Sequence, residues 1–240
     1  MFGTYQIIKI YREYHEGSST YDDLDIHVEL PEELKNSTPE LPLETQFGET
    51  ETNDLNWPMI DFESLSSINS DIVGWLYIEG TKINYPIVQG EDNSYYLKHL
   101  FDGKYNSSGC IFLDTRNNAD FSDRHSVIYG HNMRDGSMFA GLTKYKKQAY
   151  YDEHPIALLV TPGGNYRIEF FAGYVASNKD DAWKISFFTD EEFEVWLNQA
   201  VEKSCFTSTV SPAVTDKIIT LSTCSYEFDD AKFVLLGRVK

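Results

Sequence analysis

Short apolar runs of strand length recur from residue 74 to the C-terminus and are separated by turn residues. Rich in β-branched and aromatic residues, they predict eight strands, over 74–79, 85–89, 110–114, 126–131, 156–161, 166–176, 217–224 and 232–239. Glycines and a proline mark the turns, as at Gly80 and Pro162–Gly164. Because these strands do not alternate regularly with helices, the pattern favours a mainly β protein with a closed or nearly closed barrel.

Other segments have helical periodicity. Residues 2–16 predict an N-terminal helix, Asp61 can cap a short helix, and residues 137–152 predict a helical insert. The strongest signal covers 190–204, where Thr189 and Glu192 form a capping box ahead of an apolar stripe. We expect the barrel to cover this stripe, which consists of Phe193, Trp196, Leu197, Ala200 and Val201.

Composition divides the chain into two parts. Residues 17–56 are polar and rich in proline, and between Asp22 and Glu63 there are thirteen acidic residues against the single base Lys35. We therefore expect a membrane-proximal N-terminal helix and acidic linker over 1–56, and a compact domain over 57–240. The formal net charge of −18 argues against binding nucleic acid or an anionic lipid surface.

Three cysteines without a C-x-x-C pair exclude a dense disulfide framework and a zinc site of that type. The N-terminal apolar run, Phe2 to Tyr11, is too short to span a bilayer. Cys110 is interpreted as a core residue and Cys205 as a packing residue at the end of a helix. The sequence has no H-E-x-x-H, P-loop or G-x-G-x-x-G motif to indicate zinc hydrolysis, phosphoryl transfer or dinucleotide chemistry.

Cys224, His131 and Arg238 each lie at or near the end of a predicted strand. A thiol in such a position can meet a substrate while the sheet holds it rigid, although an unpaired cysteine can equally be a small core residue. His131 follows an apolar strand, whereas His99, His125 and His154 have polar neighbours and are predicted to lie at the surface. Arg238 either reaches water at the chain terminus or directs its charge at an oxyanion.

Two motifs resemble those of the sortases, the cysteine transpeptidases of Gram-positive cell surfaces. They are Thr220-Leu-Ser-Thr-Cys224 and Tyr129-Gly-His-Asn132, and the second is similar to class B in particular. The resemblance covers roughly residues 57–240. It implies an eight-stranded sortase-type β-barrel with a long helix between the sixth and seventh strands.

The resemblance also implies roles for individual residues. Cys224 would be the nucleophile, His131 the acid and base, and Arg238 the oxyanion or substrate clamp. Ser222, Asn93 and Leu97 would contact the substrate, and the loop over 178–186 would shape the groove. On this view Arg238→Lys loses far more activity than stability.

The implied reaction is acyl transfer. The enzyme would cleave a sorting signal resembling L-P-x-T-G or N-P-x-T-[GNS] after Thr, form a thioester, and pass the protein to an amine of the peptidoglycan precursor. The resemblance implies no metal or other cofactor. It places the protein on the extracellular face of the cell membrane, anchored by an N-terminal segment upstream of this chain. A thiol hydrolase of similar peptides and a non-catalytic surface β-domain remain alternatives.

Overall fold

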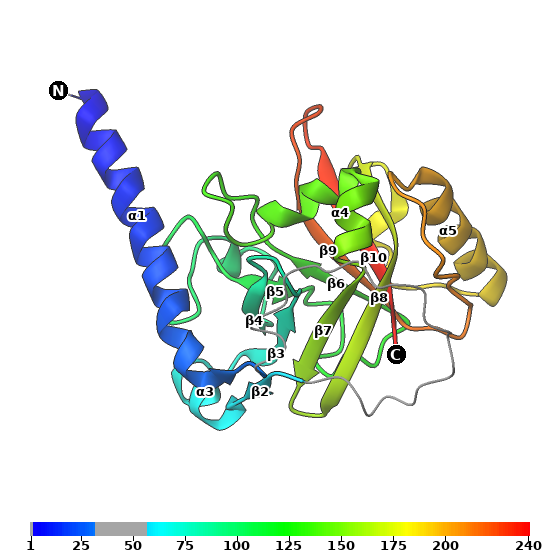
Figure 1. The fold of residues 1–240 in the computed structure, drawn as a ribbon, viewed down its shortest axis with the longest axis horizontal. Coiled ribbons are helices and arrows are strands. Elements are labelled where there is room, and N and C mark those ends of the chain that lie inside the picture. Colours follow the sequence, from blue (N-terminus) through cyan, green and yellow to red (C-terminus); the bar gives the residue numbers. More distant parts are fainter. Residues whose placement is uncertain (1, 32–56) are drawn as a thin grey trace.

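The computed structural model describes residues 2–31 and 57–240, with side chains from residue 13 onward. Eight strands close into a barrel in the order β10-β8-β7-β3-β4-β5-β6-β9 (Figure 1). Their bounds are β3 Ile72–Tyr77, β4 Asn84–Val88, β5 Ile111–Leu113, β6 His125–Tyr129, β7 Ile156–Thr161, β8 Gly164–Ala176, β9 Ile218–Cys224 and β10 Lys232–Val239. The predicted eight-stranded barrel is confirmed.

Every predicted strand is present, and its ends fall within two residues of the prediction. Two neighbouring pairs, β4 with β5 and β6 with β9, are parallel, and the other six pairs are antiparallel. A parallel pair cannot be joined by a tight hairpin, so its two strands need a longer crossover connection. The chain therefore leaves β6 and returns beside it in β9 only after forming β7 and β8.

Helices and 3₁₀ turns surround the barrel. They are α1 Phe2–Leu24, η1 Asp25–His27, α3 Phe62–Ile68, η2 Tyr95–Leu97, η3 Ala140–Lys146, α4 Gln148–Glu153, η4 Asp181–Trp183 and α5 Asp190–Lys203. The predicted insert over 137–152 is divided between η3 and α4. Asp61 caps α3 as expected, because its Oδ1 accepts a hydrogen bond from the Ser64 amide at 3.0 Å.

The N-terminal helix is longer than predicted. It continues to Leu24, and the short strand β1 (Val28–Glu29) then pairs with β2 (Met59–Ile60). Tyr21 and Leu24 are buried, and the Tyr21 hydroxyl donates a 2.6 Å hydrogen bond to the Gly109 carbonyl. Residues 17–31 are therefore not linker, since they pack on the barrel. The rest of the predicted acidic linker lies outside the described residues.

Helix α5 lies between the sixth and seventh strands of the barrel and packs beside β8 (Figure 1). Its capping box forms in part: the Thr189 hydroxyl accepts from the Glu192 amide at 3.1 Å, while the Glu192 carboxylate accepts from the Phe188 amide. Four residues of the predicted stripe, Phe193, Trp196, Leu197 and Ala200, are buried. Val201 is 45% exposed, so this part of the prediction was wrong.

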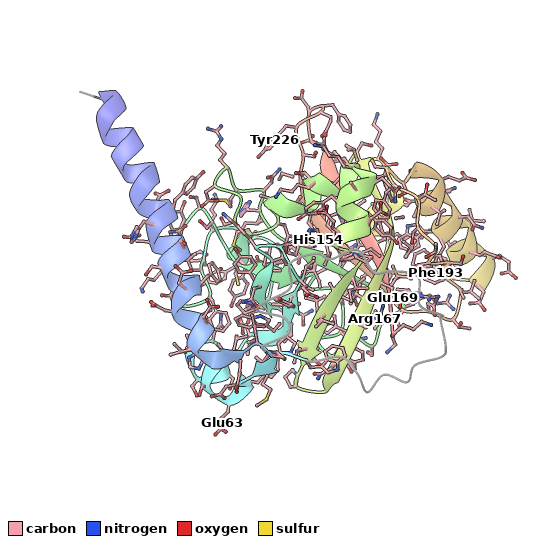
Figure 2. All side chains as sticks on the ribbon, in the orientation of Figure 1. Glu63, His154, Arg167, Glu169, Phe193 and Tyr226 are labelled. Carbon is pink, nitrogen blue, oxygen red and sulfur yellow. The ribbon has the colours of Figure 1, made fainter. Side chains whose placement is uncertain are left out.

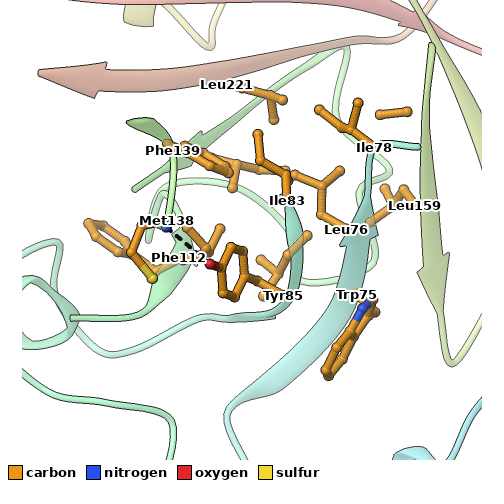
Figure 3. Close-up of a cluster of buried hydrophobic side chains, with 14 of the residues drawn as sticks. Trp75, Leu76, Ile78, Ile83, Tyr85, Phe112, Met138, Phe139, Leu159 and Leu221 are labelled. Atoms are coloured by element: carbon orange, nitrogen blue, oxygen red, sulfur yellow. Dashed lines mark hydrogen bonds between the residues drawn. The ribbon is translucent and has the colours of Figure 1, made fainter. Parts of the chain in front are cut away.

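The main core fills the barrel with aliphatic and aromatic side chains (Figure 3). Trp75, Leu76, Ile78 and Leu159 come from or adjoin the pair β3 and β7, and the Tyr85 hydroxyl accepts from the Met138 amide at 3.1 Å. A second cluster joins α5 to the outer side of β8 and β10. Within the described residues no helix has the length and apolarity needed to cross a bilayer.

His125 is fully buried, which contradicts the prediction that it lies at the surface. Its Nδ1 lies 2.7 Å from the Lys184 carbonyl, and its Nε2 lies 2.7 Å from the Thr220 hydroxyl. A carbonyl can only accept, so Nδ1 carries the proton and Nε2 accepts from Thr220. Burial lowers the pKa of His125 to about 4, because the charged imidazolium would lose its hydration there.

This histidine makes the stability of the fold depend on pH. An unfolded histidine takes up a proton near pH 6.5 and folded His125 only near pH 4, so the unfolded chain binds more protons between these values. The free energy of unfolding should fall by about 2 kcal/mol between pH 7 and pH 5. Urea unfolding at the two pH values measures the difference. His125→Gln should abolish most of it and His15→Gln, on α1, should not; equal pH dependence in both variants would contradict this assignment.

Candidate active site

The parallel pairing of β6 and β9 brings a thiol and an imidazole to one edge of the barrel. In this register Tyr129 pairs with Ser222, so the two strands end side by side. Cys224 is the last residue of β9, and His131 lies two residues beyond the end of β6. Parallel strands end at the same edge of a sheet, so both residues lie at this edge. Asn132, the neighbour of His131, contacts Cys224 across 92 positions of the sequence.

Hydrogen bonds extend this pairing past the ends of the strands. The Gly130 amide donates to the Ser222 carbonyl at 3.1 Å, and the Thr223 hydroxyl donates to the Gly130 carbonyl at 2.8 Å. Asn132 Nδ2 then donates to the Cys224 carbonyl at 2.8 Å. A Cβ at position 130 would lie 2.5 Å from Ile111 Cδ1 and 2.7 Å from the Phe139 ring, so a larger residue would displace these core side chains.

The orientation of His131 is set by a backbone carbonyl. Its Nε2 lies 2.7 Å from the oxygen of Leu97, at the end of η2. Because that oxygen has no proton to give, Nε2 is the protonated nitrogen and Nδ1 is the nitrogen that can accept and return a proton. Gly109 adopts a φ of +61° beneath this contact, and a Cβ there would lie 2.5 Å from the Tyr96 oxygen and 3.1 Å from the His131 ring.

Cys224 and His131 open into one cavity of about 610 Å³. Five of the six predicted site residues line it, namely Cys224, His131, Ser222, Asn93 and Leu97. The other lining residues are Phe112, Tyr129, Gly130, Asn178, Trp183, Thr223 and Lys232. Asn178 and Trp183 come from the loop that was expected to shape the groove. Such a mainly apolar cavity with a few converging polar groups is typical of a ligand-binding site.

Arg238 does not reach this cavity, and its position contradicts the predicted role. The antiparallel hairpin of β9 and β10 pairs Lys232 with Cys224, and six residues later it pairs Arg238 with Ile218. At about 3.3 Å per residue, Arg238 is about 20 Å along the strand from the thiol. Its guanidinium binds Glu169 at 2.8 Å and the Ser211 carbonyl at 3.1 Å.

Figure 2 shows the two ends of this hairpin. Glu169, the partner of Arg238, lies on the body of the sheet, whereas Tyr226, two residues after Cys224, lies in the connecting loop. Arg238 was predicted to lie at the site because this arginine ends the apolar strand that follows the cysteine. Since a hairpin reverses the chain, the beginning of β10 and not its end lies beside Cys224.

Lys232 occupies the position that was expected for Arg238. Its Nζ lies 3.5 Å from Cys224 Sγ, and it lines the same cavity. Sequence reasoning missed this residue, although a signal for it was present: in a hairpin the first residue of the second strand faces the last residue of the first. Asn132 and Trp183 were also missed, because neither belongs to a pattern of reactive side chains.

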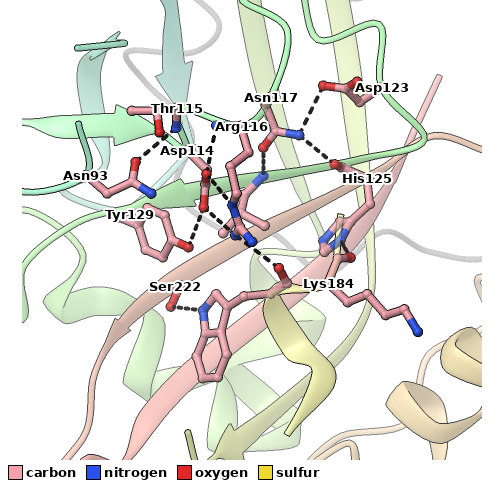
Figure 4. Close-up of polar contacts among 12 residues, drawn as sticks. Asn93, Asp114, Thr115, Arg116, Asn117, Asp123, His125, Tyr129, Lys184 and Ser222 are labelled. Carbon is pink, nitrogen blue, oxygen red and sulfur yellow. Dashed lines mark hydrogen bonds and ion pairs between the residues drawn. The ribbon is translucent and has the colours of Figure 1, made fainter. Parts of the chain in front are cut away.

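An ion pair between the half-exposed Arg116 and the buried Asp114 supports one wall of the cavity (Figure 4). Asp114 is fully buried and accepts from Arg116 at 2.7 and 2.9 Å and from the Tyr129 hydroxyl at 2.8 Å. Burial alone would raise the pKa of Asp114, but hydrogen bonds from Arg116 and Tyr129 outweigh it and lower that pKa to about 2. The carboxylate thus stays charged at neutral pH.

The same network reaches the residues that face the cavity. Arg116 donates to the Trp183 carbonyl at 3.2 Å, and the Trp183 indole donates to the Ser222 hydroxyl at 3.0 Å (Figure 4). Asn93 Oδ1 accepts from the Thr115 amide at 2.9 Å, which fixes its side chain beside the cavity. Ser222 and Asn93 are therefore held by contacts within the protein before any ligand arrives.

The three cysteines lie in different surroundings. Cys110 is buried, as predicted, and burial raises the pKa of its thiol to about 12. Cys205 is exposed, which differs from the packing position expected for it. Cys224 is partly exposed at the cavity. Among residues 2–31 and 57–240 there is no group of three or more His, Cys, Asp or Glu side chains that could hold a metal ion.

Comparison with known proteins identifies the family. The Sortase domain model matches residues 76–238. Sortase B of Staphylococcus aureus is 36% identical over 180 residues, which is 74% of each protein. Sortase B of Listeria monocytogenes is 39% identical over 181 residues, which is 75% of this chain and 74% of the relative.

Solved structures agree with these matches. A Staphylococcus aureus sortase B–substrate complex has a TM-score of 0.71 at 35% identity and covers 75% of this chain and 84% of its own. A sortase B complexed with Gly3 has a TM-score of 0.71 at 35% identity and covers 75% of this chain and 85% of its own. Sortase B from Bacillus anthracis in complex with AAEK1 has a TM-score of 0.77 at 30% identity, covering 96% of this chain and 99% of its own.

The chain belongs to the sortase family and is a cysteine transpeptidase of the cell surface. Its sortase B relatives make it a class B sortase. This membership excludes the alternative of a non-catalytic surface domain.

The placement of Arg238 leads to a prediction opposite to the one drawn from the sequence. Arg238→Met should lower the free energy of unfolding by about 1–3 kcal/mol, because it leaves the largely buried Glu169 without its main partner. Transpeptidation by the folded variant should remain within about twofold of the unmodified protein. Urea unfolding and a peptide ligation assay measure the two effects.

Arg238→Lys, which retains the charge, is the matched control and should lose less stability. A hundredfold loss of ligation activity without loss of stability would show that Arg238 takes part in the reaction.

Proposed function

We propose that this transpeptidase cleaves a sorting signal of the L-P-x-T-G or N-P-x-T-[GNS] type after Thr. It then transfers the protein to an amine of the peptidoglycan precursor. The observation that carries the proposal is that Cys224 and His131 line one cavity of about 610 Å³. The substrate complex of the Staphylococcus aureus relative is a further support, since that protein shares the fold at 35% identity.

In the first half of the reaction, the Cys224 thiol passes its proton to Nδ1 of His131, and the thiolate sulfur attacks the carbonyl carbon of the Thr residue. A carbon–sulfur bond forms, and the electron pair of the carbonyl moves to its oxygen. When that pair returns, the carbon–nitrogen bond breaks and His131 gives its proton to the leaving amine. We assign this proton to Nδ1, because Nε2 remains bonded to the Leu97 carbonyl.

In the second half, an amine enters where the leaving amine departed. His131 accepts its proton as the nitrogen attacks the thioester, and Cys224 leaves as thiolate when the new amide bond forms. The sortase B structure complexed with Gly3 is consistent with an amine in this position. The acyl group is transferred to an acceptor amine and not to water, which distinguishes this function from that of a thiol hydrolase.

We propose that Ser222, Asn93 and Leu97 contact the sorting signal. The three side chains line the cavity, and two of them are already held by hydrogen bonds from Trp183 and Thr115. Trp183, Phe112 and Tyr129 supply aromatic surface on which an apolar side chain of the signal can pack. We further propose that the protein acts at the extracellular face of the membrane and is anchored through its N-terminal side, with residues 1–56 nearest the membrane.

Cleavage and ligation can be measured separately. Mixing the protein with T-G, T-N and T-S sorting peptides, with and without a glycine-based amine, should give the ligated product only with the amine. Mass spectrometry identifies both products and the preferred signal. Hydrolysis at the same rate with and without amine, and no ligated product, would contradict the proposal.

Cys224→Ala should abolish cleavage and ligation, because no other group in the cavity can form the thioester. Its unfolding curve should match that of the unmodified protein, since the replaced side chain is partly exposed. Cys110→Ala is the matched control: it should retain ligation, while it loses stability as a buried side chain does. Residual cleavage in Cys224→Ala above about one hundredth would contradict the assignment of the nucleophile.

A further inference from the structure

The strand pairing fixes Lys232 at the mouth of the cavity. Its backbone pairs with Cys224 of β9 on one side and with Ala176 of β8 on the other. A residue paired on both sides cannot move away from its neighbours without breaking the sheet. The side chain is partly buried and its Nζ lies 3.5 Å from Cys224 Sγ, which places a positive charge beside the reacting sulfur.

No carboxylate within the described part of the chain lies at ion-pair distance from Lys232. The neighbouring loop between β9 and β10 carries Glu227, but this side chain binds Lys146 and the Ser225 hydroxyl. The hydrogen bonds from Lys146 and Ser225 lower the pKa of Glu227 to about 2, so it stays charged and engaged. Asp229 and Asp230 of the same loop are exposed to water.

The other ionisable groups around the thiol are His131, which is held by the Leu97 carbonyl, and Tyr129, which is bonded to Asp114. Burial raises the pKa of Tyr129, so its hydroxyl stays neutral at physiological pH. Of the described residues that line the cavity, Lys232 is therefore the one with a lysine or arginine side chain.

We propose that the ammonium group of Lys232 is the fixed cation of this active site, which stabilises the Cys224 thiolate and then the oxyanion of the acyl-transfer step. The second part of this inference rests on the function proposed above. When the carbon–sulfur bond forms, the negative charge passes from sulfur to the carbonyl oxygen. An ammonium has three rotatable donors, so it can contact the sulfur first and the oxygen afterwards.

This role fits the physical chemistry of a partly buried cation. A positive charge beside a thiol favours the thiolate, which is the nucleophilic form. A hydrogen bond that strengthens as charge develops on the oxygen lowers the barrier, and loss of one such donor costs about 10²–10³-fold in rate. Arg238 cannot act in this way, since its guanidinium is held by Glu169 at the other end of β10.

The test uses Lys232→Met, Lys232→Gln and Lys232→Arg in a Cys205→Ser background, because Cys205 is exposed and would also react. The first measurement is the rate of Cys224 alkylation by iodoacetamide against pH, read by peptide mass spectrometry. Lys232→Met should move the midpoint of this profile upward by about one pH unit, and Lys232→Arg should keep it near its original position. Lys232→Gln should follow Lys232→Met, because it retains donors but has no charge.

The second measurement is kcat/KM for peptide ligation. Lys232→Met should lose about 100-fold and Lys232→Arg less than about tenfold. Lys240→Met, which removes a lysine just past the far end of β10, is the matched control and should change neither measurement. Thermal unfolding of each variant shows whether the fold is retained.

Superposable alkylation profiles of Lys232→Met and the parent protein would overturn the inference, and so would a Gln variant that keeps the parent profile and rate. The function itself can fail separately. If the parent protein ligates no sorting peptide while the alkylation profile still shifts in Lys232→Met, the proposed substrate is wrong and the contact between Lys232 and the thiolate stands.

Discussion

The active site depends on one backbone constraint, the parallel register between β6 and β9. The pairing of Tyr129 with Ser222 brings the turn after β6 against the end of β9. The contacts beyond the strand ends follow from this pairing. The Gly130 amide, the Thr223 hydroxyl and the Asn132 amide group each add a hydrogen bond across the same edge. A shift of one residue would reverse the direction of every side chain on β9 and separate the thiol from the imidazole.

Residues around this edge position the reacting groups but do not react themselves. The Leu97 carbonyl fixes the proton of His131 on Nε2, and the Asp114–Arg116 pair holds the segment that carries Trp183. Fully satisfied buried polar groups of this kind specify one arrangement, because an alternative packing would leave a charge unpaired. The cavity is therefore shaped before a peptide enters, which lowers the entropy lost on binding.

The chain differs from the expected pattern in its cation. An arginine presents a planar fork with fixed directions, whereas a lysine presents a compact charge on a flexible stem. At Lys232 the stem starts from a residue paired on both sides, so the sheet supplies the rigidity that the side chain lacks. Arg238 has instead a structural role, since it neutralises Glu169 where β8 and β10 pair.

The amino-acid sequence by itself determined the strands, the helix over 190–203 and the nature of the reactive pair. Strand positions follow from the alternation and length of apolar runs, and Thr189 with Glu192 marks a helix start through local hydrogen bonds; both are properties of a few neighbouring residues. The motif around Cys224 and the one around His131 likewise are local, so they could be recognised before the fold was known.

Only the tertiary structure decided which residues meet. Arg238 and Lys232 lie on the same apolar strand, and their order along the chain tells which one faces the thiol only once β9 and β10 are known to pair as an antiparallel hairpin. His125 looked like a surface residue because its neighbours are polar, yet α5 and the loop before it cover the ring. Burial and pairing depend on segments far apart along the chain, and no local pattern records them.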